Sequence, residues 1–403
     1  MKLDKKFEAL KADNAPGQEV RKDLADINTI MTGEMLDGIP VDFSHGDVDA
    51  FPPTPDSDNV WKKGFDKGGQ QAYTEYRGAL EIRNSLAEYL AEFTGKPILA
   101  DNELIITPGT QGALFLALGT TVTNGTKVAV VEPDYFANRK LVTFFGGEII
   151  PIQLNYLGNT SENGLDLISL EKAFKEDTEV FVLSNPNNPT GYVYSESEIT
   201  KISALAAAHD VTIIVDQLYS RMLYSEEVYT HLCSCNILPE NLLTIMGPSK
   251  TESLSGFRLG VAFGTSELID RMERLQAIVS LRAAGYNQAV LNTWLREPSG
   301  WMEDRIRQHE LIRNELLKVF RTAHIETATP KAGSYLFPKL PPLKVDIHTF
   351  VHLLRYQAKV TVTPGTEFAP ECNDSIRLNF SQDFEAAISA AKRIVKMVEI
   401  YRK

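Results

Sequence analysis

The chain has few cysteines: Cys233, Cys235 and Cys372 are the only three among 403 residues. So small a number excludes a disulfide framework as the source of stability. Cys233 and Cys235 have the spacing of a metal or redox pair, but His231 is the nearest further ligand, and that leaves too few ligands for a metal. We therefore expect incidental thiols, no metal, and a reducing, cytoplasmic setting.

Long apolar runs and excess positive charge are also lacking. No stretch approaches the roughly 20 apolar residues of a membrane span, and the charged N-terminus lacks the apolar core of a signal peptide. The net charge of −12 and the isoelectric point near 5.2 argue against nucleic-acid binding through bulk electrostatics. We expect neither a membrane nor a nucleic acid as partner, although local arginines can still hold an anionic ligand.

The middle of the chain alternates short, buried-type strands with helices. The expected strands are 104–107, 127–132, 180–184 and 211–216, with helices at 112–118 and 199–209. This pattern predicts an α/β fold with a mainly parallel sheet covered on both faces. The last hundred residues, with helices expected at 303–323, 346–358 and 383–401, read as a separate α+β unit.

The N-terminal part is less regular. Residues 18–33 have the periodicity of a helix, and 79–93 predict another. Between them, 43–78 is rich in glycine, proline and aspartate and shows little periodicity. Because this stretch also carries several aromatic residues, we expect an ordered but irregular segment.

Ligands of open α/β sheets bind beyond the carboxyl ends of the strands, and unusual segments follow three expected strands. After 104–107, the turn Pro108-Gly109-Thr110-Gln111-Gly112 opens a helix whose free amides and dipole favour a phosphate. Glycine-bearing turns of this kind are also common for steric reasons alone.

The other two segments carry an amide and a carboxylate. After 180–184 comes Asn-Pro-Asn-Asn-Pro-Thr-Gly (185–191), whose prolines stiffen the loop that presents Asn188, either to a ring hydroxyl or as a tight structural turn. Asp216, at the end of 211–216, is costly to bury unless it is paired. Placed against a pyridine nitrogen it would keep that nitrogen protonated, while Tyr219 could donate to a ring oxygen; the alternative is that Asp216 caps the next helix.

Lys250 stands in Gly-Pro-Ser-Lys-Thr-Glu-Ser-Leu-Ser-Gly-Phe-Arg-Leu-Gly (247–260). Its amine can form a Schiff base with an aldehyde, and Arg258 can clamp a phosphate as a planar fork. Most lysines are solvated surface charges, so a functional role for Lys250 depends on the other unusual segments described above.

Together these motifs resemble the fold-type I aminotransferases that use pyridoxal 5′-phosphate (class I/II, the aspartate aminotransferase superfamily), from about residue 40 to the C-terminus. The resemblance implies a large domain with a mainly parallel seven-stranded sheet, and a smaller α+β domain built from the N- and C-terminal segments. We expect 1–50 to be part of the small domain, 51–295 to be the cofactor-binding domain, and 296–403 to complete the small domain.

The resemblance also implies a role for each matching residue. Lys250 would hold the cofactor and shuttle the substrate proton, Asp216 would pair with the pyridinium nitrogen, and Asn188 and Tyr219 would bind the ring oxygen. Tyr135, in Glu-Pro-Asp-Tyr, would stack on the ring. The expected phosphate contacts are Thr110, Gln111 and Arg258, with Ser249 or Ser255 compensating for Gly247, where some relatives have serine.

Four further residues concern the substrate and the partner subunit. Arg377 matches the arginine that holds the substrate α-carboxylate, and Gly46 lies where the family passes its backbone close to the substrate. Tyr73 matches a tyrosine that reaches the neighbouring subunit's phosphate, which implies a homodimer with shared active sites. Arg282 lies near the position of a second arginine for a distal carboxylate, or is an ordinary helix-end arginine.

The implied reaction is transamination from an L-amino acid to a 2-oxo acid by a ping-pong mechanism, with glutamate or aspartate as one donor. A β-eliminating lyase or a decarboxylase would keep the same Lys250, Asp216 and Arg377. Some relatives are sensor halves of transcription regulators, but here no basic recognition helix precedes the resemblance.

Overall fold

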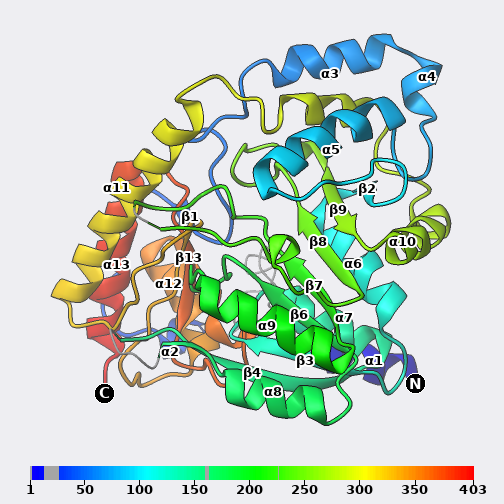
Figure 1. Ribbon diagram of the computed structural model, residues 1–403. Coiled ribbons are helices and arrows are strands. Elements are labelled where there is room, and N and C mark those ends of the chain that lie inside the picture. Colours follow the sequence, from blue (N-terminus) through cyan, green and yellow to red (C-terminus); the bar gives the residue numbers. More distant parts are fainter. Residues whose placement is uncertain (1, 13–26, 159–162, 226) are drawn as a thin grey trace.

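The computed structural model describes residues 2–12, 27–158, 163–225 and 227–403. A large sheet with helices on both faces lies beside a smaller unit that contains both the early and the late parts of the chain (Figure 1). The expected α/β class and the two-part organisation are therefore confirmed.

The large sheet places its strands in the order β2-β9-β8-β7-β6-β3-β4-β5. Their bounds are β2 Leu104–Thr107, β3 Lys127–Glu132, β4 Glu148–Asn155, β5 Gly164–Leu165, β6 Val180–Ser184, β7 Thr212–Asp216, β8 Leu242–Met246 and β9 Gly260–Gly264. The neighbours from β8 to β4 are parallel, whereas β9 and β5 run antiparallel to the strands beside them. Seven strands were expected; in the described residues the two-residue β5 adds an eighth at one edge.

Two hydrophobic cores lie on opposite faces of this sheet, because successive side chains of a strand alternate between faces. Leu104 and Ile106 belong to one core and Ile105 to the other. The first core includes α5 (Leu80–Thr94), α8 (Leu167–Lys175) and α9 (Glu196–His209). The second includes α6 (Gly109–Thr121), α7 (Phe136–Phe145) and α10 (Ser266–Val279).

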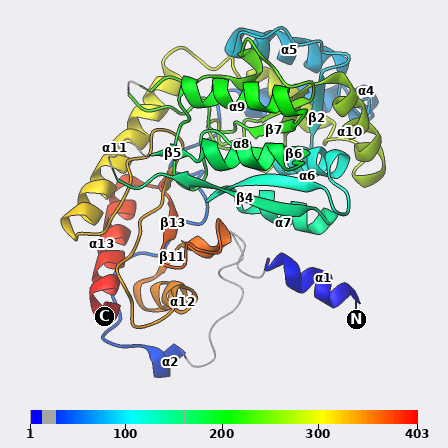
Figure 2. The same ribbon diagram turned by 60° about the horizontal axis from the view of Figure 1, so that its bottom comes forward.

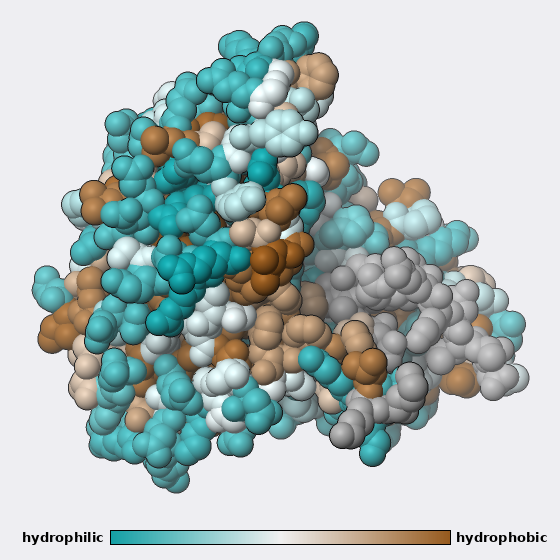
Figure 3. Space-filling model, turned by 90° about the vertical axis from the view of Figure 1, so that its right-hand side faces the viewer, coloured by the Kyte–Doolittle hydropathy of each residue, from teal (hydrophilic) through white to brown (hydrophobic). Residues whose placement is uncertain are grey.

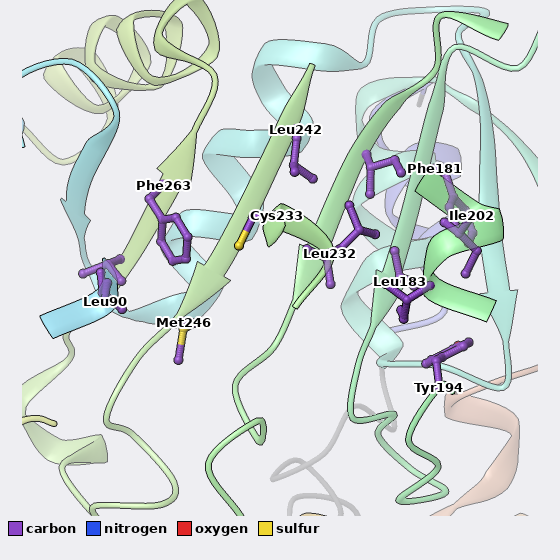
Figure 4. Packing of buried hydrophobic residues seen from close by; sticks show 14 of the residues in the cluster. Leu90, Phe181, Leu183, Tyr194, Ile202, Leu232, Cys233, Leu242, Met246 and Phe263 are labelled. Carbon is purple, nitrogen blue, oxygen red and sulfur yellow. The ribbon is translucent and has the colours of Figure 1, made fainter. Parts of the chain in front are cut away.

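Cys233 lies in the first core, near Met246 and Leu232 (Figure 4). It is buried, and burial raises the pKa of its thiol. A buried, protonated thiol packs as a small apolar side chain, which is how this residue contributes to the structure.

A third core joins the two ends of the chain: Leu36 and Val41 pack with Leu378 and Ile394. This unit contains β1 (Val41–Asp42) paired with β11 (Val360–Thr361), and the sheet β10-β13-β12 (Tyr335–Leu336, Ile376–Asn379, Thr363–Pro364). Its helices are α11 (Trp301–Thr322), α12 (Ile347–Ala358) and α13 (Phe384–Tyr401). On this distribution we propose the division into 51–295 and a small domain of 1–50 with 296–403.

The prediction that 43–78 is irregular is partly wrong, because this stretch contains the helix α3 (Ser57–Asp66) and the single turn α4 (Gly69–Ala72). Trp61 and Phe65, four residues apart on α3, stack with ring centroids 5.7 Å apart. Gly64 lies between them, where an added Cβ would come within 2.5 Å of Ala289 Cβ. Close packing against another segment thus stabilises a helix that contains a glycine and two lysines, and local periodicity does not reveal this packing.

The N-terminal helix α1 (Lys2–Leu10) packs against α7, with Lys6 Nζ 4.0 Å from the ring centroid of Phe144 (Figure 2). Most of the helix expected at 18–33 lies outside the described residues, and its described part contains only α2 (Ile27–Ile30). The 3-10 turns are Leu232–Ser234, Ser255–Phe257, Tyr286–Thr293 and Gly365–Glu367. Within the described ranges no helix has both the length and the apolar character needed to cross a bilayer.

The start of α9 generates a prediction on stability. Ser195 Oγ accepts a hydrogen bond from the Glu198 amide at 3.3 Å, and Glu198 Oε2 accepts one from the Ser195 amide at 2.8 Å, which makes a reciprocal cap. Ser195→Ala should lower the free energy of unfolding by about 1 kcal/mol. Urea denaturation followed by circular dichroism measures this, with Ser197→Ala on the exposed side of the same helix as the control. Equal losses in the two variants would contradict the prediction.

Candidate active site

A cavity of about 250 Å³ opens where the carboxyl ends of β6, β7 and β8 meet the small unit. It brings together ten of the residues singled out in the sequence: Thr110, Gln111, Tyr135, Asn188, Asp216, Tyr219, Ser249, Lys250, Arg258 and Arg377. The pairing of β6 with β7 sets Ser184 opposite Asp216, so the loops that follow them begin at the same level. Parallel strands in register thus explain why segments far apart in sequence converge here.

Asp216 is buried, with 8% of the residue exposed. Its Oδ1 accepts a hydrogen bond from the Leu218 amide at 3.1 Å within a turn, so the side chain does not cap a helix there. Burial raises the pKa of the Asp216 carboxyl to about 6, and the Leu218 amide opposes this shift. A carboxylate in such surroundings is stabilised by a cationic partner.

The opposite end of the cavity is a close junction built from glycines. An added Cβ on Gly109 would lie 2.6 Å from Arg258 Nη2, and one on Gly260 would lie 2.4 Å from the Thr110 amide nitrogen. Gly109 has a φ of +78°, at the first residue of α6. The guanidinium and the first amides of a thirteen-residue helix are therefore adjacent, which is the chemistry of an anion site.

The same junction explains why glycine rather than serine stands at position 247. A Cβ there would lie 2.9 Å from Thr110 Cγ2 and 3.2 Å from the Gly260 Cα. A serine would need one of these neighbours to move. Ser249 and Ser255, which both line the cavity, are the nearby hydroxyls, and Ser249 Oγ donates to the Leu259 carbonyl at 3.4 Å.

Lys250 lies between this cavity and a second one of about 250 Å³, which Gly46 helps to line. Within the described part of the chain its amine makes no hydrogen bond or ion pair. The amine is thus free to react, and the chain segment around Lys250 determines its position.

Tyr135 is held from both ends. Its hydroxyl donates to Gln111 Oε1 at 2.8 Å, and its amide donates to Asp134 Oδ1 at 2.6 Å. Asp134 Oδ2 accepts from the Ser184 amide at 2.9 Å, and burial raises the pKa of Asp134 to about 7. This buried carboxyl, which the sequence did not single out, connects the Tyr135 segment to the end of β6.

Arg377 is almost completely buried, yet it is in contact with the cavity. Its Nη2 donates to the Ser44 carbonyl at 2.9 Å and its Nη1 to Asn188 Oδ1 at 3.4 Å, while its Nε has no partner within the described residues. The rings of Tyr335 and Phe368 lie 4.5 and 4.9 Å from its Cζ. The guanidinium is therefore fixed in orientation with one donor unsatisfied, which suits a carboxylate.

Tyr335 is a site residue that sequence reasoning missed. It lies in Gly-Ser-Tyr-Leu-Phe (333–337), and nothing in that string indicated a role for the ring. In the structure its hydroxyl accepts a hydrogen bond from the Tyr219 hydroxyl at 2.7 Å. It therefore links the β7 loop to the small unit and also packs on Arg377.

His45, the residue before Gly46, lines both cavities. Its Nε2 lies 3.4 Å from Asp42 Oδ2, and its Nδ1 lies 3.1 Å from the Gly46 carbonyl. The hydrogen bond with Asp42 raises the pKa of His45 to about 9, although burial opposes this shift. At neutral pH it is therefore an imidazolium at the rim of the site.

Tyr73 and Arg282 lie outside the cavity of their own chain. Tyr73 is 82% exposed, and the Arg282 Cζ lies 5.7 Å from its ring centroid and 5.3 Å from that of Tyr76. The two predicted residues therefore stand side by side on the surface.

The residues present fit pyridoxal 5′-phosphate. The glycine junction with Arg258 offers an anion site, Asp216 offers a buried negative charge, and Lys250 offers an amine without a partner among the described residues. All three border one cavity, as a small molecule with a phosphate, a pyridine nitrogen and an aldehyde requires.

Comparison with known proteins agrees with this geometry. A model of the family "Aminotransferase class I and II" matches residues 39–394. The crystal structure of an aspartate aminotransferase from Rhodobacter sphaeroides is 57% identical, with 100% of each chain covered and a TM-score of 0.95.

More distant relatives match over most of their length. The putative aminotransferase YugH of Bacillus subtilis is 28% identical over 82% of this chain and 84% of its own. Aromatic-amino-acid aminotransferase 2 of Thermococcus litoralis is 26% identical over 84% and 86%. The chain belongs to the class I and II aminotransferases, which are pyridoxal-phosphate-dependent enzymes that transfer amino groups.

Proposed function

We propose that this aminotransferase takes its amino group from a dicarboxylic L-amino acid, glutamate or aspartate, and passes it to a 2-oxo acid in the cavity around Lys250. The observation that carries the proposal is the convergence of the Lys250 amine, the buried Asp216 carboxylate and the Arg377 guanidinium on one small cavity. The 57% identical structure is that of an aspartate aminotransferase, which supports the choice of donor.

The residues around the cofactor have separate roles. Asp216 holds the pyridine nitrogen protonated, and the bound cofactor then supplies an electron sink for the substrate α-carbon. Arg258, Thr110, Gln111 and Ser249 bind the phosphate, while the Tyr135 ring covers the pyridine.

Four other residues bind the substrate carboxylate, bind the ring oxygen of the cofactor, or move the proton. Arg377 holds the α-carboxylate, Asn188 and Tyr219 bind the ring oxygen, and the Lys250 amine moves the proton at the α-carbon. Each role places a charged or donor group against the atom whose charge it complements.

We further propose that the enzyme is a cytoplasmic homodimer with shared sites. Tyr73 is exposed and lies beside Arg282, and the side of the molecule seen in Figure 3 has groups of hydrophobic side chains among hydrophilic ones. The segments next to Tyr73 and Arg282 in the sequence also contain exposed apolar residues: Phe65, Tyr76, Leu80, Ile278, Val279 and Leu281. Exposed apolar side chains of this kind favour an interface between subunits, which would bring Tyr73 and Arg282 to the partner's cavity.

Replacement of Lys250 tests the central role. The purified protein with pyridoxal 5′-phosphate should show the absorbance band of a lysine-bound aldehyde, and Lys250→Ala should lose it together with at least about 1,000-fold of the activity. The native enzyme should form 2-oxo acid from glutamate or aspartate only when an acceptor is added. Release of pyruvate, ammonia or CO₂ without an acceptor would instead identify a lyase or a decarboxylase.

The raised pKa of Asp216 predicts how cofactor binding depends on pH. Below pH about 6 the carboxyl of the cofactor-free protein is protonated and must lose its proton to pair with the pyridinium. Affinity for the cofactor should therefore fall as pH drops from 7 to 5, by a slope approaching about tenfold per pH unit. Fluorescence titration measures this affinity, and Asp216→Asn shows the slope that the remaining groups cause, including the phosphate and the Lys250 amine. The idea fails if the slope of the native protein coincides with that of the Asp216→Asn variant.

Mixed dimers test the shared site. Lys250→Ala and Arg282→Ala chains, each weak on dicarboxylic donors, should on mixing regain about a quarter of native activity, because half the dimers are mixed and each contains one intact site. Recovery is expected only if Arg282 acts on the partner's cavity. No recovery with glutamate or aspartate would refute its role across the interface.

A further inference from the structure

A group of four charged, largely buried residues includes Glu252, two residues after Lys250. Glu252 is fully buried, and it accepts a hydrogen bond from Arg221 Nη1. Arg221 also binds Glu297 as a planar fork, with both N–O distances at 2.8 Å. The fourth member is Arg305 of α11; burial lowers the pKa of its guanidinium to about 10, and the charge of Glu252 opposes this shift. We call these four residues the Glu252 cluster.

The Glu252 cluster holds the three residues after Lys250 by both side chain and backbone. Arg305 Nη1 donates to the Thr251 carbonyl at 3.0 Å and to Ser253 Oγ at 2.8 Å. The Thr54 amide donates to the Glu252 carbonyl at 3.0 Å, and Thr251 Oγ1 donates to Glu252 Oε2. Each residue from 251 to 253 is therefore hydrogen-bonded to a residue far away in the sequence, Arg305 for Thr251 and Ser253 and Thr54 for Glu252.

The residues that bind this segment come from the loop after β7 and from the two places where the chain passes between the large and the small unit. Arg221 stands two residues after Tyr219, in the loop that follows β7. Glu297 lies in the connection before α11, and Arg305 Nη2 donates to the carbonyl of Pro52, after β1. The Glu252 cluster thus connects the Lys250 segment to the β7 loop and to the two places where the chain passes between the units.

Lys250 needs such support because its own amine has no partner within the described residues. The Ser253 amide donates to the Lys250 carbonyl at 3.3 Å, and Ser253 has a φ of +56°, which a residue other than glycine adopts only when its surroundings hold it. We propose that Glu252, held by Arg221, is a positioning residue that keeps the Lys250 amine at its place in the cavity. This inference rests on the proposed role of Lys250.

The charges of the Glu252 cluster explain why a glutamate, rather than a neutral residue, stands at position 252. Burial raises the pKa of the Glu252 carboxyl to about 7, and the charge of Arg221 opposes this shift. With Glu252 ionised, two glutamates balance two arginines. Removing one member leaves the others buried with unbalanced charge, so the arrangement of the segment depends on each of them.

The test uses two ligands that differ only at the atom Lys250 would bind. Pyridoxal 5′-phosphate has an aldehyde, whereas pyridoxine 5′-phosphate has an alcohol that cannot bond to an amine. The ratio of their dissociation constants therefore reports the contribution of the Lys250 amine. In Glu252→Gln, replacing a charged hydrogen bond by a neutral one should reduce this ratio by about fivefold or more, with pyridoxine 5′-phosphate binding unchanged within about twofold.

Glu198→Gln is the matched control, since Glu198 is also a buried, hydrogen-bonded glutamate but lies on α9, outside the residues that line the cavity. It should lower the melting temperature and leave the ratio unchanged. If Glu252→Gln also loses only thermal stability and keeps the native ratio, the positioning role is refuted. Should that variant not fold, Arg221→Lys, which keeps the charge and loses the fork, decides by the same ratio.

Lys250→Ala separates this inference from the proposed function. Without the amine the two ligands should bind with nearly equal affinity. A native ratio in Lys250→Ala would show that another group binds the aldehyde, and the proposed role of Lys250 would then fail, whatever Glu252 does.

Discussion

The register of β6 on β7 and of β7 on β8 is the constraint on which the site depends. It sets Ser184 opposite Asp216 and Asp216 opposite Ile245, so three loops leave the sheet at one level. The first carries Asn188, the second Tyr219 and the third Lys250. A slip of one residue in either pairing would turn the buried side chains to the other face and separate groups that line one small cavity.

Much of the site could be predicted because its residues stand in stiff, unusual strings at strand ends. The sequence 185–191 and the segment around Lys250 are recognisable without any knowledge of packing. Tyr335 could not be found in this way, because its place follows from the meeting of β10 with the β7 loop, a contact between residues more than a hundred positions apart. Asp134 was hidden for the same reason, since its partner Ser184 belongs to another strand.

In the fold, too, elements with a local sequence signal could be predicted, whereas elements that depend on distant contacts could not. The buried β-branched runs predicted β3, β6 and β7 to within a residue at each end because such strands are apolar throughout. The helix α3 was missed because its stability comes from contacts with the segment near Ala289 rather than from its own periodicity. Contacts between two chains are harder still to predict from one sequence. Tyr73 and Arg282 lie outside the cavity of their own chain, and their proposed roles require a second copy.

The third core contains residues from Ile27 to Tyr401, whereas every strand of the large sheet lies between Leu104 and Gly264. During synthesis, the sheet can bury its two cores once the chain has been made as far as Trp294, while the segments that complete the third core are still being made. The N-terminal apolar residues must wait for the final helix before they are covered. The order of translation thus leaves the early apolar residues of the third core, such as Val41 and Phe43, uncovered until the final helix is made, and the Arg377 segment reaches a large unit whose strands are already paired.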